Sequence, residues 1–197
     1  KTKIHVLEAL GGENEKISEV VAEKYNLRDV LHPVCAAILV DGLGSAVPLS
    51  NGIEDNFFAN DGQITKSPIR ALTLAALAPK YGQHLWDLGA GSGSVSIEWV
   101  LSDKSLGATA VERDPSRCAI IAQNVKDLGL DNLSILVGSN LELISALRPP
   151  NAVFIGGGLT KELMKKLWMI IPEKTRLVAN SVTLETEMIL QNAFNEF

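Results

Sequence analysis

The stretch that decides the fold is Trp86-Asp87-Leu88-Gly89-Ala90-Gly91-Ser92-Gly93, in which a short apolar run ends in a glycine-rich loop. A segment with helical periodicity, residues 94–101, follows directly. A buried strand that turns through glycines into a helix is typical of an open α/β sheet, whose ligands bind at the carboxyl ends of the strands. Glycines in such a loop let the backbone approach a ligand closely. The stretch therefore predicts both a fold class and the position of a ligand site.

Outward from this loop, short apolar runs alternate with segments of helical periodicity. This alternation predicts an α/β fold, a doubly wound Rossmann-like sandwich with a mostly parallel sheet. Ser67 is the expected N-cap of the first helix, with Pro68 at its first position. The expected strands are 84–88, 108–112, 133–137, 152–155 and 176–179, and the expected helices are 67–78, 94–101, 115–128, 141–147, 160–171 and 183–194.

The first fifty residues form a separate part of the chain. We expect a strand over residues 3–10, a helix over 15–25 from the spacing of Ile17 and its apolar neighbours, and a strand over 34–40. Residues 41–52, rich in Gly, Ser and Pro, read as a linker. A stretch of this size is small for an independent core. We therefore interpret residues 1–50 as the tail of an upstream domain and 51–197 as a second domain.

The amino-acid composition argues against several classes of function. The 197 residues are 46% apolar and 21% charged, with a net charge of −5, which argues against a non-specific nucleic-acid binder. Cys35 and Cys118 are the two cysteines, and the lack of any Cys/His cluster leaves no expected metal site. No apolar run approaches the ~18 residues of a membrane span. We expect a cytoplasmic protein that does not bind a membrane.

Two cofactor classes fit a glycine loop of this kind. The dinucleotide fingerprint G-x-G-x-x-G fails here, because Ser94 stands where its third glycine would fall. Asp87, two residues before Gly89, can brace the loop and bind a ligand ammonium group directly or through water. Glu112 ends the next strand and can accept hydrogen bonds from both hydroxyls of an adenosine ribose. The pattern resembles motif I of class I S-adenosylmethionine methyltransferases.

The fourth expected strand runs into Gly156-Gly157-Gly158. It lacks the Asn/Asp-Pro-Pro-Tyr/Phe motif of many amino-group methyltransferases, and neither cysteine is placed as a nucleophile for cytosine methylation. Cys118 reads as a small buried residue within a helix. The triglycine leaves room for a bulky planar substrate, or it is a plain turn; both interpretations stay open.

Five segments of the second domain carry a resemblance to a known family: residues 61–66, 87–98, 111–115, 153–157 and 179–186. Together they resemble the decarboxylating precorrin-6 methyltransferases of cobalamin biosynthesis, which methylate C5 and C15. Residues 1–12 resemble the end of the tetrapyrrole methylase domain that is often fused upstream in this family. The resemblance also implies that two antiparallel strands beyond residue 197 complete the sheet, and that the chain is a piece of a bifunctional protein.

The resemblance implies S-adenosylmethionine as cofactor. Thr65 would lie over its methionine part, the loop from Gly89 through Ala90, Gly91 and Ser92 to Gly93 would wrap the amino-acid moiety, and Glu112 would hold the ribose. Asn140 would sit near the adenine, through its backbone. Homo-oligomer formation, with a tetramer as the expected form, also rests on the resemblance alone.

The implied substrate is a tetrapyrrole with many carboxylates, so basic side chains should line the entrance. Lys66 and Arg70 are the preferred candidates, as i,i+4 neighbours beside Thr65; Lys161, Lys165 and Lys166 follow the triglycine. Gly156 and Gly157 would give the substrate room. Asn180 and Glu185 are candidate catalytic residues at the fifth strand, although Glu185 can instead cap the next helix.

Other classes remain open at this point: an NAD-dependent oxidoreductase, a non-catalytic domain that binds S-adenosylmethionine, and an RNA methyltransferase. The failed fingerprint weighs against the first, and the net charge of −5 weighs against the last. His84 is expected at the surface or sheet edge without a catalytic role. Trp86, Trp99 and Trp168 are expected in the core.

Overall fold

The computed structural model describes residues 1–42 and 46–196. The chain divides into two compact units, Lys1–Val47 and Pro48–Phe197. Residues 43–45 of the expected linker lie outside the described residues.

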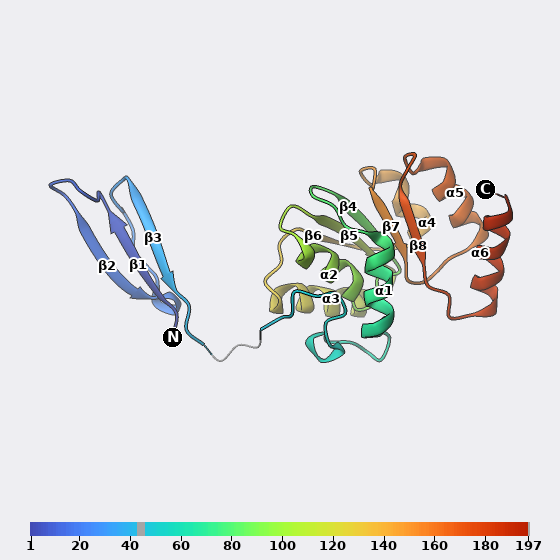
Figure 1. Ribbon diagram of the computed structural model, residues 1–197, viewed down its shortest axis with the longest axis horizontal. Coiled ribbons are helices and arrows are strands. Elements are labelled where there is room, and N and C mark those ends of the chain that lie inside the picture. The colour runs from blue at the N-terminus through green and yellow to red at the C-terminus, as the bar shows by residue number, and fades with distance from the viewer. Residues whose placement is uncertain (43–45, 197) are drawn as a thin grey trace. The chain divides into compact units, whose positions relative to one another are not determined.

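The first unit is a three-stranded antiparallel sheet in the order β2-β1-β3 (Figure 1). Its elements are β1 (Lys3–Glu8), β2 (Lys16–Val21), a short 3₁₀ turn η1 (Ala22–Lys24) and β3 (Val34–Leu39). Few side chains are buried, and Glu8 is one of them at 2% exposed. Its carboxylate accepts a hydrogen bond from the Leu31 amide at 2.8 Å and pairs with Lys16 at 3.4 Å.

The helix expected over 15–25 is wrong, because most of this segment is strand β2. The strand pairs along its whole length with β1, from Lys3 opposite Val21 to Glu8 opposite Lys16. Ile17 and the Val20–Val21 pair are β-branched and favour a pleated strand. Their spacing suits one face of a helix equally well, so the pairing with β1 decides the outcome.

The second unit is a doubly wound α/β sandwich, as predicted. Its five strands are all parallel and run in the order β6-β5-β4-β7-β8. β4 lies at the centre and is buried along its full length. The strand bounds are β4 (His84–Leu88), β5 (Gly107–Glu112), β6 (Leu133–Val137), β7 (Ala152–Ile155) and β8 (Arg176–Ala179).

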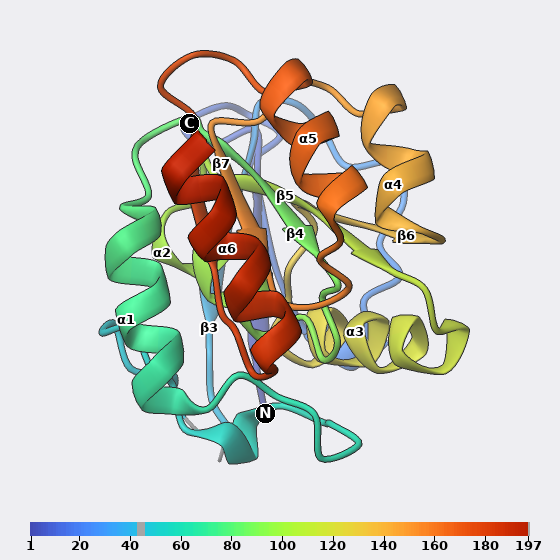
Figure 2. The ribbon, with the colours of Figure 1, turned by 90° about the vertical axis from the view of Figure 1, so that its right-hand side faces the viewer.

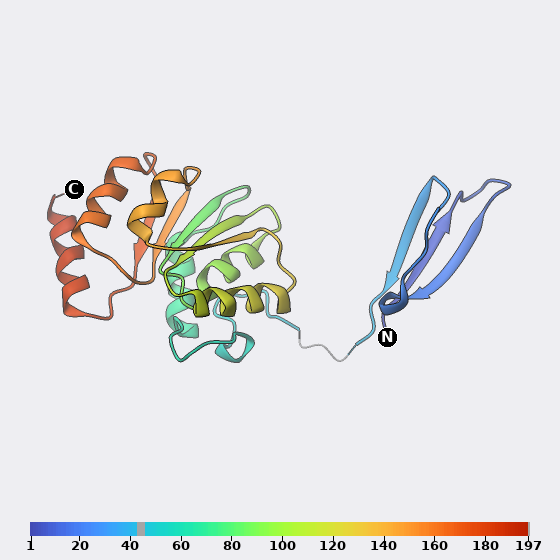
Figure 3. The same cartoon turned by 180° about the vertical axis from the view of Figure 1, so that it is seen from behind.

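Helices cover both faces of this sheet (Figures 1, 2 and 3). One face carries α1 (Ser67–Leu77), α2 (Ser94–Ser102) and α3 (Pro115–Asp127), which pack on one another in sequence. The other carries α4 (Asn140–Leu143) with the turn η3 (Ile144–Ala146), then α5 (Lys161–Ile170) and α6 (Leu184–Glu196). A 3₁₀ turn η2 (Asp55–Phe57) precedes α1. No described helix is long and apolar enough to cross a bilayer.

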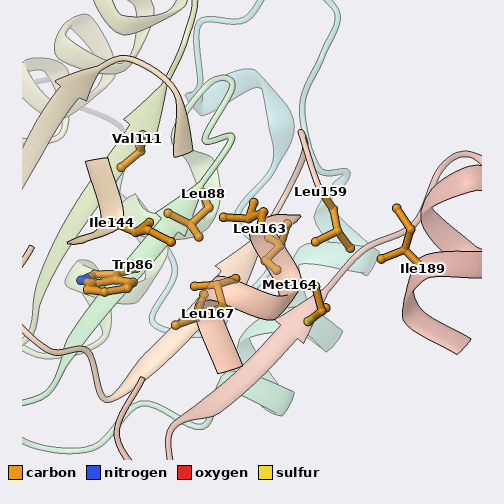
Figure 4. Packing of buried hydrophobic residues seen from close by; sticks show 11 residues of the cluster. Trp86, Leu88, Val111, Ile144, Leu159, Leu163, Met164, Leu167 and Ile189 are labelled. Carbon is orange, nitrogen blue, oxygen red and sulfur yellow. The ribbon is translucent and has the colours of Figure 1, made fainter. Parts of the chain in front are cut away.

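The core on the second face is built around β4 (Figure 4). Alternation along this strand points Trp86 and Leu88 toward α5, whose Leu163 and Leu167 pack against them, and Ile189 of α6 closes the cluster. Of the three tryptophans expected in the core, Trp86 and Trp99 are buried at 2% and 0% exposed. The expectation for Trp168 is wrong, because it is 49% exposed on α5.

Two local expectations are also corrected. α1 begins after Lys66, which is its N-cap residue in extended conformation, so Ser67 is already helical; its hydroxyl donates to the Gly52 carbonyl at 2.6 Å instead. His84 is buried rather than at the surface. Its Nε2 lies 2.8 Å from Thr109 Oγ1 and its Nδ1 contacts Arg148, and burial lowers its pKa from 6.5 to about 4.

Candidate functional site

A cavity of about 830 Å³ opens at the carboxyl edge of the second unit's sheet. Its size is in the range of sites for drug-sized ligands and cofactors. The loops after β4, β5, β6, β7 and β8 all contribute to its wall, together with the segment before α1. The wall includes the predicted site residues Thr65, Lys66, Gly89, Ala90, Gly91, Ser92, Glu112, Asn140, Gly156, Gly157 and Asn180.

The glycine loop forms the floor of this cavity. The amides of Gly89 and Ala90 both donate to the Val111 carbonyl, at 2.9 and 3.1 Å, so the loop is tied to the end of β5. Gly89 has a φ of +72° and touches the backbone of Gly157, so no side chain fits between the two loops. Backbone, rather than side chains, therefore faces a ligand here.

Glu112 lies at the end of β5, 7% exposed, with its carboxylate at the cavity wall. One oxygen accepts from the Gly91 amide at 2.9 Å and the other from the Asp114 amide at 3.0 Å. Each carboxylate oxygen has a further lone pair for a ligand donor. The two amides fix the carboxylate in one orientation, which suits it to a pair of neighbouring hydroxyls.

Two predicted cofactor residues, Asp87 and Gly93, lie behind the loop and do not line the cavity. Gly93 has a φ of +75° at the N-cap of α2 and packs against Ile121, so it shapes the loop. Asp87 is 1% exposed, and its Oδ2 accepts from the Ser96 amide at 3.2 Å. Burial raises the pKa of Asp87 from 3.8 to about 6, against the opposing effect of the Ser96 hydrogen bonds.

Among the described residues, two buried side-chain oxygens lack a hydrogen-bond partner: Asp87 Oδ1 and Ser92 Oγ. Both belong to the strand–loop segment under the cavity, and Ser92 lines it. Buried polar atoms usually find a partner, so an orphan at a cavity wall marks a place for a ligand group. No group of three or more His, Cys, Asp and Glu side chains suited to a metal ion occurs among the described residues.

A segment ahead of α1, residues 59–66, covers the glycine loop; we call it the cover segment. Asn124 of α3 holds its start, because its side chain bonds both the amide and the carbonyl of Ala59 and also the Ser92 carbonyl. Asp61 pairs with Arg117 of α3 at 2.8 Å. The cover segment ends in Thr65 and Lys66, which both line the cavity.

Arg70 does not line the cavity, which corrects its predicted role in substrate binding. It is 0% exposed, and its guanidinium donates to Glu98, to Asp55 and to the carbonyls of Thr65 and Ile53. It pairs with Glu98 at 2.5 Å and with Asp55 at 3.1 Å, and it lies over the Phe58 ring at 4.7 Å. Lys66 and Arg70 are neighbours, since both pair with Asp55, but the buried carboxylate of Glu98 draws Arg70 inward and away from the cavity.

Asn180 and Glu185, the two candidate catalytic residues, are placed differently. Asn180 lies at the end of β8 and lines the cavity, where its Nδ2 donates to Thr73 at 3.1 Å. Glu185 is exposed in the first turn of α6 and is not part of the cavity wall. Thr183 caps that helix, since its Oγ1 accepts from the Thr186 amide. Among the described residues, Glu185 therefore makes no contact that would support catalysis or capping.

The sequence reasoning missed part of the wall. Arg113 and Arg117 line the cavity, whereas Lys161, Lys165 and Lys166 do not; Lys166 donates to the Leu141 carbonyl at 2.6 Å. The signal was available for Arg113, because it follows the end of β5 directly and so lies at the ligand edge of the sheet, whereas Arg117 lies within α3. Asn140 lines the cavity; its side chain donates to the Gly157 carbonyl at 3.3 Å and its own carbonyl accepts from the Ile144 amide, so its contact with an adenine stays a prediction.

Comparison with solved structures first identifies the class of protein to which the fold belongs. The fold is the Rossmann-like fold of S-adenosylmethionine methyltransferases with a five-stranded parallel sheet. The crystal structure of the C-terminal domain of precorrin-6Y C5,15-methyltransferase from Rhodobacter capsulatus superposes with a TM-score of 0.73 at 44% identity, over 76% of this chain and 80% of that one.

Sequence comparison then defines the family. The precorrin methyltransferase domain family matches residues 56–197, and the chain belongs to this family. It is 40% identical over 194 residues to the precorrin-6Y C(5,15)-methyltransferase [decarboxylating] of Sinorhizobium sp, covering 96% of this chain and 47% of that protein. It is 32% identical to the probable cobalt-precorrin-6B C(15)-methyltransferase (decarboxylating) of Saccharolobus solfataricus, over 68% of this chain and 71% of that one. The chain spans about half the length of the first curated relatives it matches.

Proposed function

We propose that this chain is the part of a cobalamin-biosynthesis enzyme that methylates a precorrin-6-type tetrapyrrole at C5 and C15 with S-adenosylmethionine and removes CO₂ from an acetate side chain. The observation that carries the proposal is the single wall shared by the glycine loop, Glu112 and Asn180. One cavity therefore contains both a cradle suited to a cofactor, at the glycine loop and Glu112, and space for a substrate beside Asn180. The 40% identity to a decarboxylating relative supports the choice of reaction.

The residues present fit S-adenosylmethionine. Glu112 would accept the ribose hydroxyls, and the loop Gly89–Ser92 would hold the amino-acid part, for which the unpartnered Ser92 hydroxyl is a donor. The backbone contact of Gly89 with Gly157 leaves a flat cradle that a Cβ would fill. Asp87 would brace this loop from behind through Ser96. When bound, this cofactor supplies an electrophilic methyl group.

The substrate end of the cavity would be formed by Thr65, Lys66 and Ile69 from the start of α1 and by Asn180 and Val182. Lys66 has its side chain 64% exposed there and can pair with a substrate carboxylate. Ile69 and Val182 are 49% and 90% exposed, and they offer an apolar surface to the face of a macrocycle. An electron-rich ring carbon needs little activation, so these residues act mainly by alignment, which can contribute up to ~7–11 kcal/mol.

Loss of CO₂ leaves an electron pair that the conjugated macrocycle can accept. The contribution of the chain would be to hold the acetate carboxylate away from bulk water, since desolvation disfavours its charged form. We assign this step to the apolar substrate end rather than to Glu185, which lies outside the cavity.

We further propose that residues 1–47 belong to an adjoining tetrapyrrole methylase domain in the full polypeptide. Strand β3 supports this proposal, because Ile38 and Leu39 are 61% and 60% exposed on a sheet that no described segment of its unit covers. Such apolar surface is normally buried against a partner. Both cysteines are free, which suits the cytoplasm. Assembly into a homo-oligomer, with a tetramer as the expected form, stays a prediction.

The direct experiment supplies the protein with a precorrin-6-type tetrapyrrole and S-adenosylmethionine that carries a CD₃ group. Mass spectrometry should find a product that has gained two CD₃ groups and lost one CO₂. The Glu112→Ala variant is the control and should give little product. A folded, cofactor-binding protein that leaves the tetrapyrrole mass unchanged would contradict the proposal.

A further inference from the structure

Thr73 is a buried hydroxyl residue of α1, 3% exposed, that lies beside the substrate end of the cavity. Its Oγ1 contacts two groups. It donates to the Ile69 carbonyl one turn earlier, at 2.8 Å, and it lies 3.1 Å from Nδ2 of Asn180 across the gap to β8. Ile69 and Asn180 both line the cavity, whereas Thr73 does not.

The proton count fixes the direction of the second contact. A threonine hydroxyl has one proton to donate, and here the short bond to the Ile69 carbonyl uses it. Toward Asn180 the hydroxyl oxygen can therefore only accept. Nδ2 must face it as the donor, and Oδ1, which is 3.4 Å from the same hydroxyl, is the more distant atom. The amide group is held in one of its two orientations.

The backbone of Asn180 is fixed as well, because its amide donates to the Ile155 carbonyl at 3.2 Å, at the end of β7. With main chain and Nδ2 both held, the remaining acceptor of the side chain is Oδ1. Among the described residues, Thr73 alone lies within hydrogen-bond distance of Oδ1. This oxygen is thus available to a ligand in the cavity.

We propose that Thr73 is a positioning residue that holds the Asn180 amide so that its carbonyl oxygen accepts a hydrogen bond from an N–H group of the substrate. Resting on the proposed function, this assigns a pyrrole-type N–H donor as the group recognised at this point of the wall. A carboxylate or carbonyl of the substrate would be repelled there. Thr73 acts through Asn180 and does not touch the substrate itself.

The test uses Thr73→Val, which keeps the shape and removes the hydroxyl, and Thr73→Ser, which keeps the hydroxyl. We expect Thr73→Val to lower kcat with the tetrapyrrole by about 10-fold, since misplacement of a contact group costs rate. Affinity for S-adenosylhomocysteine should stay within about 2-fold, and Thr73→Ser should restore most of kcat. Thr73→Val added to Asn180→Ala should cause no further loss, because the two residues act as one unit.

A second readout does not depend on turnover. In ¹⁵N-labelled protein, the side-chain NH₂ signals of Asn180 should shift and exchange faster with water in Thr73→Val, and Thr73→Ser should return them. Unmoved signals would overturn the inference, as would a Thr73→Val loss that adds fully to that of Asn180→Ala. If the wild-type chain shows no turnover, the proposed function fails while the NH₂ signals still decide the role of Thr73.

Discussion

A Cβ atom added to Gly89 would lie 2.5 Å from the carbonyl oxygen of Gly157, a separation that real side chains do not tolerate. The two glycines belong to the loops after β4 and β7, which are neighbouring strands of the sheet. Their backbones touch directly under the cavity. The central part of the cradle is therefore determined by the absence of a side chain at Gly89, and also at Gly156, where an added Cβ would lie 2.9 Å from the Gly89 carbonyl oxygen.

Gly89→Ala should destabilise the protein more than its backbone conformation alone explains. Overpacking costs about 1–3 kcal/mol, on top of roughly 1 kcal/mol for a positive φ. Gly82→Ala is the matched control, because Gly82 has a φ of +73° and nothing within 4 Å of an added Cβ. Urea denaturation measures the loss in free energy of unfolding for both variants. Equal losses in the two variants would show that the contact with Gly157 does not matter.

Arg70 should be a stability residue. Arg70→Met leaves the Glu98 carboxylate, 2% exposed, without its cation, which typically costs about 3–5 kcal/mol. Lys66→Met is the control, because its pair with Asp55 is exposed and should contribute less than about 1 kcal/mol. The free energy of unfolding checks this. If Arg70→Met unfolded like wild type but lost tetrapyrrole affinity, the buried placement of Arg70 would be refuted.

The ion pair of Asp61 with Arg117 should hold the cover segment over a bound cofactor. Hydrogen bonding by Gln63 and Arg117 lowers the pKa of Asp61, so the pair stays charged at neutral pH. Arg117→Gln should speed dissociation of S-adenosylhomocysteine by about 3–10-fold, because the cover segment loses a contact that ties it to α3. Arg113→Gln is the matched change of a cavity arginine for which no pair with Asp61 is seen.

Stopped-flow displacement measures these off-rates. Asp61→Asn should behave as Arg117→Gln does, and combining the two changes should add little. If dissociation were faster in Arg113→Gln but unchanged in Arg117→Gln, Arg113 rather than Arg117 would hold the cover segment, and the prediction would be wrong.

His84 should make the fold sensitive to acid. Its pKa is about 4 in the folded protein and 6.5 ordinarily, so the unfolded chain binds the proton more readily. Stability from neutral His84 is complete above pH 6.5 and declines as the pH falls toward 4. The loss between pH 7 and 5 should be about 1–2 kcal/mol.

The pH dependence of unfolding in wild type and in His84→Gln isolates this effect. Asp87 acts in the opposite sense, because its raised pKa makes the folded state bind a proton more readily as the pH falls below about 6. Asp87 is present in both proteins, so the difference between their free energies of unfolding at each pH no longer contains its contribution. A difference that does not change with pH would contradict the buried, neutral state of His84.

The sequence predicted the second unit well, because its elements are bounded by strong local signals. Strands β4, β6, β7 and β8 match the predicted bounds, since each is a short apolar run between turn residues. The common position of Glu112 and the glycine loop at one cavity was predictable for a related reason, because a parallel sheet places the carboxyl ends of its strands at one edge.

The features that could not be predicted from the sequence depend on contacts between residues that are distant along the chain. The periodicity of Ile17 and its neighbours fits helix and strand alike, and only pairing with β1 selects the strand. The burial of Arg70 depends on Glu98 and Asp55, 28 and 15 positions away. The contact of Thr73 with Asn180 spans 107 positions. No local pattern encodes such contacts.

The most direct test of the account is titration calorimetry of the protein with S-adenosylhomocysteine, repeated with Glu112→Ala and with NADH. We expect S-adenosylhomocysteine to bind with a roughly micromolar Kd and NADH not to bind. Glu112→Ala should lower the affinity for S-adenosylhomocysteine by at least about 10-fold, because a hydrogen bond to a charged acceptor contributes ~1.5–3 kcal/mol. Tight binding of NADH, or equal affinity of wild type and Glu112→Ala for S-adenosylhomocysteine, would contradict the account.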